Sequence, residues 1–256
     1  MKLRNVPVES DVYQVSITGT HSSGKSTLLN LFERGSMNEF LIPEDSEDLG
    51  WGAIYDIEHD QTVPVVTVPE AATWLANRMN WPEYLTTDYN HGVQTEIDAQ
   101  HVHRLIEAYM TIPVVRAGVA ARYGELSDAT VLMTDRSIAD GLPYSANRTP
   151  DEPNIDVSPN VIGGLNSRIF IAREMMNTYV DLVLIADHKE VPFQSSRLRT
   201  YDHALRDQVA EDISRYYFTN ADNYQIRWLR GSGVERFELA TDLILSHIAQ
   251  FEPVSE

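Results

Sequence analysis

The residues best suited to chemistry form a glycine-rich loop near the start of the sequence. The segment reads Gly19-Thr20-His21-Ser22-Ser23-Gly24-Lys25-Ser26, a complete G-x-x-x-x-G-K-[ST] or Walker A motif. In such a loop the glycines let successive backbone N–H groups turn inward and surround phosphate oxygens. The lysine reaches the outer phosphates, and the serine hydroxyl is a ligand of Mg²⁺. We therefore predict that a nucleoside triphosphate contacts Gly19, Ser22, Ser23, Gly24, Lys25, Ser26 and Thr27.

The segments on either side of the loop favour this interpretation over a chance match in a Gly/Ser-rich turn. Residues 12–18 have the β-rich apolar pattern of a strand, and residues 25–34 have the pattern of a helix. A helix N-terminus at that position favours an anion. Lys25 is one of only three lysines in the chain, and it stands where the outer phosphates need it. The expected cofactor is Mg²⁺ with ATP or GTP.

A glutamate follows the second predicted strand, residues 63–68. Glu70 opens a predicted helix at the carboxyl edge of the sheet, beside the expected position of the phosphates. A carboxylate there can accept the proton of a substrate hydroxyl or hold a metal-bound water. It can also complement the positive end of the helix, which is a common arrangement. Position alone leaves both interpretations open.

An acid–arginine pair follows the third predicted strand, residues 130–134. A buried apolar strand that ends in an acid is the Walker-B pattern, so Asp135 is expected to orient Mg²⁺ together with Ser26. Arg136 follows at once and can hold a substrate or phosphate oxygen through two parallel hydrogen bonds. A purely structural role for the pair is the alternative. The glycine-rich loop upstream favours the functional interpretation.

Three arginines lie in the polar segment after the fourth predicted strand, residues 180–186. Arg197 and Arg199 fit a lid over residues 188–206 that closes on the nucleotide. Arginine there neutralises the charge of the transferring phosphoryl group. Arg206 fits this role less well. Exposed arginines are also ordinary on helix surfaces, so a surface role is the alternative for all three.

Several histidines and aromatic residues are weaker candidates. His101 and His103 are two residues apart in a predicted helix, so they point to different faces and form a poor pair of metal ligands. His21 lies within the loop, at a position that tolerates many side chains. Tyr216-Tyr217-Phe218 has helical spacing and is predicted to belong to the core rather than to a base-stacking surface.

The predicted elements alternate in a way that brings these candidates to one edge of a sheet. The strands are expected at 12–18, 63–68, 130–134, 180–186 and 224–229, and the helices near 25–34, 70–79, 92–122, 163–178, 201–219 and 234–250. Such alternation predicts an α/β fold with a central parallel sheet of five strands and helices on both faces. Ligands of such sheets bind at the carboxyl ends of the strands.

Two connections are irregular and longer than the rest. Residues 35–62 contain eight acidic residues and no Lys or Arg, and they are predicted to form a solvated acidic insertion. Residues 147–161 contain three prolines and several acids, which indicates a loop over the cleft. Long connections of this kind are either functional or disordered, and the sequence does not decide between the two.

Composition limits the class of protein. The 256 residues, 43% of them hydrophobic, predict one domain over residues 1–256. The absence of cysteine excludes disulfides, thiol catalysis and Cys-type zinc sites. A net charge of −18 disfavours broad binding to nucleic acid without excluding a local basic groove. With no signal-peptide pattern and no segment suited to a membrane, we expect a cytoplasmic protein, whose oligomeric state the sequence does not indicate.

Four motifs together resemble those of one family of nucleotide-binding proteins. They are G-x-x-x-x-G-K-S-T after the first strand, V-P-E-A-A-T after the second, T-D-R-S-x-x-D-G-x-x-Y after the third and V-P-F-x-x-x-R-L-R after the fourth. Over residues 12–250 the chain resembles the AAA-type ATP-binding, kinase-like P-loop family that includes ribosylnicotinamide kinases. It is more distantly similar to deoxynucleoside and thymidylate kinases.

The resemblance implies a P-loop NTPase fold of the kinase type, with strand order 2-3-1-4-5. It implies that Glu70 serves as a base or as a ligand of the substrate hydroxyl. It also implies that Asp135 and Arg136 are the acid–arginine pair of such kinases, and that Arg197 and Arg199 belong to the lid.

These features predict a small-molecule kinase that transfers the γ-phosphoryl group of ATP to a hydroxyl of a nucleoside-like acceptor. The predicted catalytic residues are Lys25, Glu70, Asp135, Arg136, Arg197 and Arg199. A regulatory ATP- or GTP-binding protein, or a slow NTPase, is the alternative, because it uses the same loop without an acceptor pocket. A kinase that acts on a hydroxyl in a nucleic acid is the third hypothesis, and the charge of −18 counts against it. No N-K-x-D motif for guanine follows the fourth strand, which favours ATP.

Overall fold

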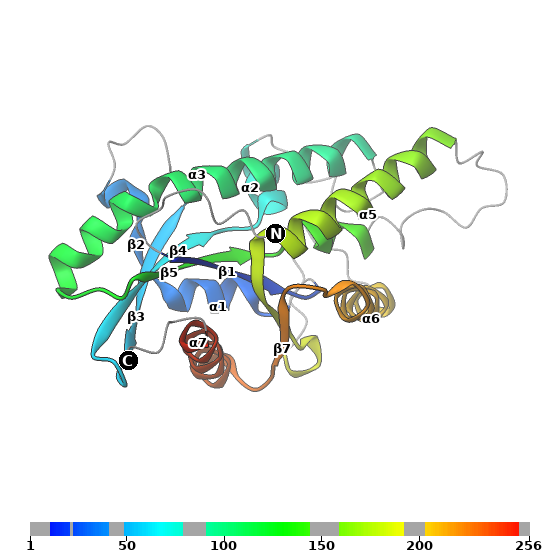
Figure 1. The fold of residues 1–256 in the computed structure, drawn as a ribbon. Coiled ribbons are helices and arrows are strands. Elements are labelled where there is room, and N and C mark those ends of the chain that lie inside the picture. The colour runs from blue at the N-terminus through cyan, green and yellow to red at the C-terminus, as the bar shows by residue number, and fades with distance from the viewer. Residues whose placement is uncertain are drawn as a thin grey trace.

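The computed structural model describes residues 11–20, 23–40, 49–78, 91–143, 159–191 and 203–250. Within these ranges the chain forms an α/β structure in which helices cover both faces of one central sheet (Figure 1). Four predicted candidates lie outside the described residues, namely His21, Ser22, Arg197 and Arg199. Most of the predicted loop 147–161 also lies outside them.

Seven strands form the sheet within the described residues, in the order β2-β3-β4-β5-β1-β6-β7. Their bounds are β1 Asp11–Thr18, β2 Glu33–Ser36, β3 Gly50–Asp56, β4 Gln61–Val68, β5 Ala129–Asp135, β6 Val180–Ala186 and β7 Gln225–Leu229. Strands β4, β5, β1, β6 and β7 are parallel, and they correspond to the predicted strands in the order 2-3-1-4-5. The predicted α/β class and strand order are therefore confirmed.

The helices lie close to their predicted ranges. They are α1 Lys25–Phe32, α2 Ala71–Arg78, α3 His91–Tyr123, α5 Pro159–Tyr179, α6 His203–Asn220 and α7 Gly233–Ala249, with 3₁₀ turns η1 Met37–Glu39, η2 Ile138–Asp140 and η3 His188–Glu190. Helices α1 and α7 cover one face of the sheet, and α3, α5 and α6 cover the other (Figure 1). In the described ranges, no helix combines the length and apolar character that crossing a bilayer requires.

The central strands are buried on both faces because helices cover both, and most of their side chains are apolar. On one face, apolar side chains of β1, β4, β5 and β6 pack against α1 and α7. On the other face, a cluster around α3 includes Leu132 and Ile112, and a second cluster around α5 and α6 includes Met176 and Ile213. The sheet is thereby held on both sides, and its carboxyl edge carries the connections that hold the candidate residues.

The prediction of a five-stranded sheet is wrong, because the sheet has seven strands within the described residues. The prediction of a solvated insertion at residues 35–62 is wrong for the described part of that range. Strand β3 pairs antiparallel with β4, and β2 pairs antiparallel with β3, so two strands extend the predicted sheet. Trp51 and Ile54 of β3 are buried in the core. The described acidic residues of the segment lie in η1, at the end of β3 and in the turn at 57–60, where water still reaches them.

Glycine explains why β3 has a weak sequence pattern. A Cβ on Gly52 would lie 1.9 Å from the carbonyl oxygen of Phe32, the last residue of α1. The strand therefore crosses the end of the helix with its backbone in direct contact, which only glycine allows. With glycine at positions 50 and 52, β3 lacks the regular alternation of side chains that predicts a strand.

Candidate functional site

The phosphate loop, residues 19–26, connects the carboxyl end of β1 to the first turn of α1. Gly19 has a φ of 139° and Gly24 a φ of 83°, conformations that other residues adopt only with strain. A Cβ on Gly19 would also lie 2.9 Å from the carbonyl oxygen of Ala186, at the end of β6. Gly24 is the N-cap of α1, and no described side chain caps this helix. The N–H groups of the first turn can therefore bind an anion.

Lys25 is buried inside this loop, with 5% of its surface exposed. Its Nζ donates hydrogen bonds to the carbonyl oxygen of Thr20 at 2.8 Å and to Oγ of Ser23 at 3.4 Å. Burial, together with the positive charge of Arg136, lowers the pKa of Lys25 to about 8, although nearby carboxylates oppose this shift. An anion bound beside Nζ would raise this pKa again, because it stabilises the charged form.

An arginine of α7 holds the phosphate loop through hydrogen bonds to backbone carbonyl oxygens. Arg236 donates from Nη1 to the carbonyl oxygen of Ser23 at 2.6 Å and from Nη2 to the carbonyl oxygen of Asp187 at 2.5 Å. The phosphate loop is thereby tied to the segment that follows β6. The sequence analysis did not identify this residue. An arginine on the apolar face of a predicted helix could have indicated a buried polar contact.

Ser26 and Asp135 meet beside the loop, as the sequence predicts. Ser26 Oγ donates a hydrogen bond of 2.5 Å to Oδ2 of Asp135, the last residue of β5. Burial raises the pKa of Asp135 above its ordinary value, although the positive charge of Lys25 opposes this shift. The pair results from the parallel register of β1 with β5, which places the ends of both strands next to each other.

The Ser26–Asp135 pair fits a Mg²⁺ ion. This ion binds oxygen, and in nucleotide sites one or two protein side chains hold it together with phosphates and water. Oδ1 of Asp135 is buried and has no hydrogen-bond partner in the described part of the chain, so one carboxylate oxygen is left for the metal or its water. No group of three or more His, Cys, Asp or Glu side chains suited to a metal occurs among the described residues. The two residues could thus hold Mg²⁺ together with the phosphates of a nucleotide.

Glu70 and Arg136 form an ion pair across the carboxyl edge, between β4 and β5. Arg136 Nε donates to Glu70 Oε1, and Thr73 Oγ1 donates to Glu70 Oε2 at 2.8 Å. The side chains of Glu70 and Arg136 are each 15% exposed. Burial alone would raise the pKa of Glu70, but the charges of Arg136 and Lys25 outweigh it and lower this pKa to about 2. Glu70 is therefore ionised, and it lies beside the phosphate loop as the partner of Arg136.

The backbone of Arg136 is strained. Its φ is 76°, in the left-handed region that residues other than glycine rarely adopt. The backbone N–H donates to the carbonyl oxygen of Ile17 at 2.8 Å, and Nη1 donates to the carbonyl oxygen of Gly19 at 3.2 Å. These contacts hold the guanidinium between the phosphate loop and Glu70.

A second carboxylate lies behind Arg136. Asp140 is 1% exposed, and its Oδ1 accepts hydrogen bonds of 2.5 Å from Thr18 Oγ1 and from the Tyr217 hydroxyl. Its Oδ2 lies 3.8 Å from Nη1 of Arg136. Burial raises the pKa of Asp140, although Arg136 opposes this shift. Asp140 therefore links the end of β1, the arginine and α6, and sequence reasoning did not place it in the site.

The remaining described candidates have other contacts. Thr27 is exposed in the first turn of α1. Arg206 is buried and donates to the carbonyl oxygens of residues 188 and 191, so it fixes the segment after β6. His101 is buried, whereas His103 is exposed and contacts Glu107, which confirms that the two histidines point to different faces.

Comparison with solved structures identifies the fold. A thymidylate kinase from Candida albicans is 17% identical, with a TM-score of 0.50, over 96% of this chain and 96% of that one. A thymidylate kinase from Ehrlichia chaffeensis is 13% identical, with a TM-score of 0.46, over 93% of this chain and 98% of that one. NadR in complex with NAD and AMP-PNP is 14% identical, with a TM-score of 0.47, over 96% of this chain and 52% of that one. No family model matches the chain, and a comparison with curated proteins gives no match.

The chain therefore has the α/β fold of the P-loop kinases. Its five parallel strands have the predicted order, and the glycine-rich loop lies between the central strand β1 and the first helix. The resemblance that the four sequence motifs indicate is confirmed at the level of the fold.

Proposed function

We propose that this chain is an ATP-dependent kinase that transfers the γ-phosphoryl group to a hydroxyl of a small, nucleoside-like acceptor. The observation that carries the proposal is the convergence of two side-chain pairs on the phosphate loop. One is Ser26 with Asp135, and the other is Glu70 with Arg136. The charges of Asp135, Glu70 and Arg136 all act on Lys25. Groups suited to metal, phosphate and acceptor thus share one site.

Nucleotide binding would use the loop amides and Lys25. The ammonium would exchange its hydrogen bonds to Thr20 and Ser23 for oxygens of the outer phosphates. Mg²⁺ held by Ser26 and Asp135 would supply charge neutralisation on the phosphates. Arg236 would keep the loop in its phosphate-binding conformation through its bond to the Ser23 carbonyl.

Glu70 is suited to orient an acceptor hydroxyl. A carboxylate whose pKa is about 2 is a weak base, but a loose phosphoryl-transfer transition state requires little proton removal at the start. Each carboxylate oxygen of Glu70 has one described hydrogen-bond donor and retains a second acceptor position for the hydroxyl. Arg136 would hold a neighbouring oxygen of the acceptor.

In the transfer step, the bond between the acceptor oxygen and the γ-phosphorus forms. The bond from this phosphorus to the β–γ bridging oxygen breaks, and ADP leaves with that electron pair. The hydroxyl proton passes to Glu70 as the new bond is completed, and then to water. We propose that Arg197 and Arg199 neutralise the charge on the transferred group from the lid.

A regulatory nucleotide-binding protein or a slow NTPase is the second candidate. The Glu70–Arg136 ion pair favours it, because each of these two charged groups already has a partner of opposite charge without an acceptor molecule. Such a protein would need no acceptor beside Glu70. The two candidates therefore differ in whether an added hydroxyl compound increases ATP consumption.

The test measures ATP consumption with a panel of nucleosides that includes nicotinamide riboside. A kinase shows turnover that depends on one acceptor, with the phosphorylated acceptor as product. Turnover that no acceptor changes would identify the regulatory protein or NTPase instead.

Replacing Glu70 tests the role of the carboxylate. Glu70→Gln should lower acceptor-dependent kcat by roughly 10²-fold or more and leave the Kd for Mg·ATP unchanged, because the change removes the hydroxyl acceptor and not the phosphate ligands. Glu211→Gln, on the exposed surface of α6, is the matched control. If Glu70→Gln turns over near the wild-type rate, Glu70 has no role in the transfer and serves only at the N-terminus of α2.

A further inference from the structure

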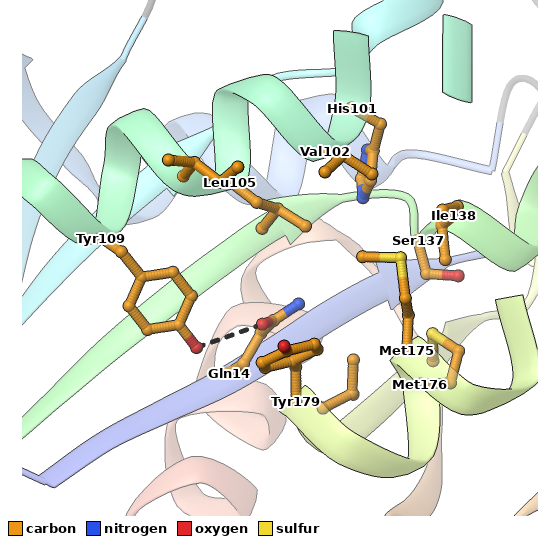
Figure 2. A pocket seen from close by; sticks show the side chains of 12 residues that line it. Gln14, His101, Val102, Leu105, Tyr109, Ser137, Ile138, Met175, Met176 and Tyr179 are labelled. Atoms are coloured by element: carbon orange, nitrogen blue, oxygen red, sulfur yellow. Dashed lines mark hydrogen bonds between the residues drawn. The ribbon is translucent and has the colours of Figure 1, made fainter. Parts of the chain in front are cut away.

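Asp140 is a buried carboxylate beside the proposed site, and the transfer step gives it no role. It lies in η2, just after β5, and the first of its two carboxylate oxygens is held by hydroxyl groups. Oδ1 accepts hydrogen bonds of 2.5 Å from Thr18 Oγ1 and from the Tyr217 hydroxyl, and one of 3.4 Å from Ser137 Oγ. Ser137 also lines a pocket between α3 and α5, but its hydroxyl points away from this pocket (Figure 2). Three hydroxyls thus fix the position of Oδ1.

The second oxygen of this carboxylate has very different surroundings. Oδ2 of Asp140 is buried and has no hydrogen-bond partner in the described part of the chain. It forms an ion pair with Nη1 of Arg136, but the distance of 3.8 Å is too long for a hydrogen bond. A buried acceptor without a donor destabilises a fold, and a charged acceptor does so more than a neutral one. Oδ2 is therefore a position at which a donor would be stabilised.

Arg136 can supply this donor through a small movement of its side chain. Its Nε is bound to Glu70, and its Nη1 donates to the carbonyl oxygen of Gly19 at 3.2 Å. Nη1 carries two N–H groups, so it can donate to Asp140 and keep its bond to Gly19. An approach of about 1 Å would bring Nη1 from 3.8 Å to the distance of a charge-assisted hydrogen bond. Glu70 and Asp140 thus lie on two sides of one guanidinium.

The pKa values of the two carboxylates show what such a movement would change. Burial would raise the pKa of Glu70, but the charges of Arg136 and Lys25 outweigh it and lower this pKa to about 2. Burial raises the pKa of Asp140, and Arg136 opposes this shift only in part. A guanidinium bonded to Oδ2 would lower the pKa of Asp140 and let the pKa of Glu70 rise. The movement would therefore stabilise ionised Asp140 and make Glu70 a better base.

We propose that Asp140 is a positioning residue that receives the guanidinium of Arg136 when an acceptor hydroxyl takes its place on Glu70. The exchange keeps the arginine paired with a carboxylate throughout. It releases Oε1 of Glu70 for the hydroxyl and Nε of Arg136 for a neighbouring oxygen of the acceptor. The part played by the acceptor rests on the proposed function, whereas the second position of Arg136 does not.

The first experiment uses neither nucleotide nor acceptor. Glu70→Gln removes the charge that holds Arg136, so the guanidinium should move to the remaining carboxylate. A crystal structure of this variant should show a guanidinium nitrogen of Arg136 about 2.9 Å from Oδ2 of Asp140, where the present distance is 3.8 Å. The wild-type protein, crystallised in the same form, is the reference for this distance.

Thermal unfolding gives a second readout of the same exchange. Asp140→Asn should change the midpoint of the wild-type protein little, because Arg136 keeps its pair with Glu70. In the Glu70→Gln background the same change should lower the midpoint by roughly 4 °C or more, because a buried arginine is left without a carboxylate. Asp222→Asn, which removes the carboxylate of an exposed ion pair with Arg173, is the matched control. It should have the same effect in both backgrounds.

Steady-state kinetics tests the part played by the acceptor in a protein that keeps Glu70, and so remains informative if Glu70→Gln does not fold. The substrate is the acceptor that gives turnover in the nucleoside panel. Asp140→Asn should raise the KM for this acceptor about tenfold and affect kcat less, because Arg136 then stays on Glu70 and competes with the hydroxyl. A structural role alone would lower the amount of folded enzyme and leave KM unchanged.

Three results would overturn the proposal. The first is a Glu70→Gln structure in which Arg136 is no closer to Asp140, and the second is a set of midpoints in which the two substitutions are additive. The third is an unchanged KM in folded Asp140→Asn. A protein with no acceptor-dependent turnover would instead refute the proposed kinase, and the structure and unfolding of Glu70→Gln would still decide whether Arg136 has a second position.

Discussion

Strand β1 has two faces of opposite composition, although both are buried. Tyr13, Val15 and Ile17 point toward α1 and α7 and join an apolar cluster. The alternate residues after Val12 are polar, and they point toward the side of α3, α5 and α6: Gln14, Ser16 and Thr18. An ordinary core strand would be apolar on both faces, since helices cover both.

Each polar residue of β1 has a defined hydrogen-bond partner. Gln14 accepts from Tyr109, Ser16 accepts from Thr134 at 3.0 Å, and Thr18 donates to Asp140. Buried polar groups that are satisfied in this way specify one arrangement of their neighbours. We infer that the apolar face of β1 provides stability, whereas the polar face positions the residues of the site.

The largest expected effect is at Lys25, the first residue of α1, in the loop that follows the polar end of β1. Lys25→Ala should lower nucleotide-dependent turnover by about 10²–10³-fold, because it removes the charge that contacts the outer phosphates. The thermal midpoint should not fall, since the buried ammonium, whose pKa is lowered to about 8, is itself costly to the fold. Kinetics and calorimetry of the same preparation check both results. Unchanged turnover would exclude the loop from the reaction.

The second effect is on the pH dependence of nucleotide binding. In the free protein the pKa of Lys25 is about 8, and a bound triphosphate favours the protonated form. Above pH 8 the complex therefore binds more protons than the free protein. The affinity for Mg·ATP should then fall about tenfold per pH unit above pH 8, whereas below pH 8 this affinity should be constant. Calorimetry in buffers of different ionisation enthalpy measures the proton uptake. A Kd that does not change above pH 8 would contradict this account of Lys25.

The third effect concerns Asp140, which contacts Arg136 from behind. Asp140→Asn keeps an acceptor for Thr18 and Tyr217 but removes the charge beside the guanidinium, and it should lower acceptor-dependent kcat/KM by roughly tenfold. Burial raises the pKa of Asp140, so the folded state favours the neutral acid, and stability from this group falls as pH rises. The neutral amide should therefore preserve stability at neutral pH. A loss of stability with unchanged kinetics would assign Asp140 to the core alone.

The smallest effect belongs to the apolar face. Ile17→Val should lower the free energy of unfolding by about 0.5–1.5 kcal/mol, because it removes one buried methyl group. Activity per folded molecule should not change, since the side chain points away from the site. Denaturant unfolding and kinetics below the unfolding transition measure the two quantities. A loss of activity equal to that of Asp140→Asn would remove the distinction between the two faces.

The predictable parts of the fold are those with local patterns. The five parallel strands are runs rich in apolar and β-branched residues, and the helices have clear periodicity, so both could be predicted from the sequence. Strand β3 could not, because Gly50 and Gly52 interrupt its alternation and because the acidic residues around it dominate the pattern. Its burial depends on contact with the end of α1, which no local pattern encodes.

The candidate site divides in the same way. Lys25 and Ser26 belong to a contiguous motif, and Glu70 and Asp135 could be located because each follows a strand. The partners that fix these residues come from distant segments. Tyr217 is 77 positions from Asp140, and Arg236 is 213 positions from Ser23, so only the assembled sheet and helices bring them together.

The two antiparallel strands that extend the sheet, β2 and β3, also change which strand lies at its margin. Without β2 and β3, the eight-residue strand β4 would present unpaired backbone groups to other molecules. The outermost strand is instead β2, which has four residues and carries Glu33 and Arg34. A brief, charged border of this kind is a poor template for strand pairing between copies. Strands β2 and β3 should therefore protect the protein from aggregation at high concentration.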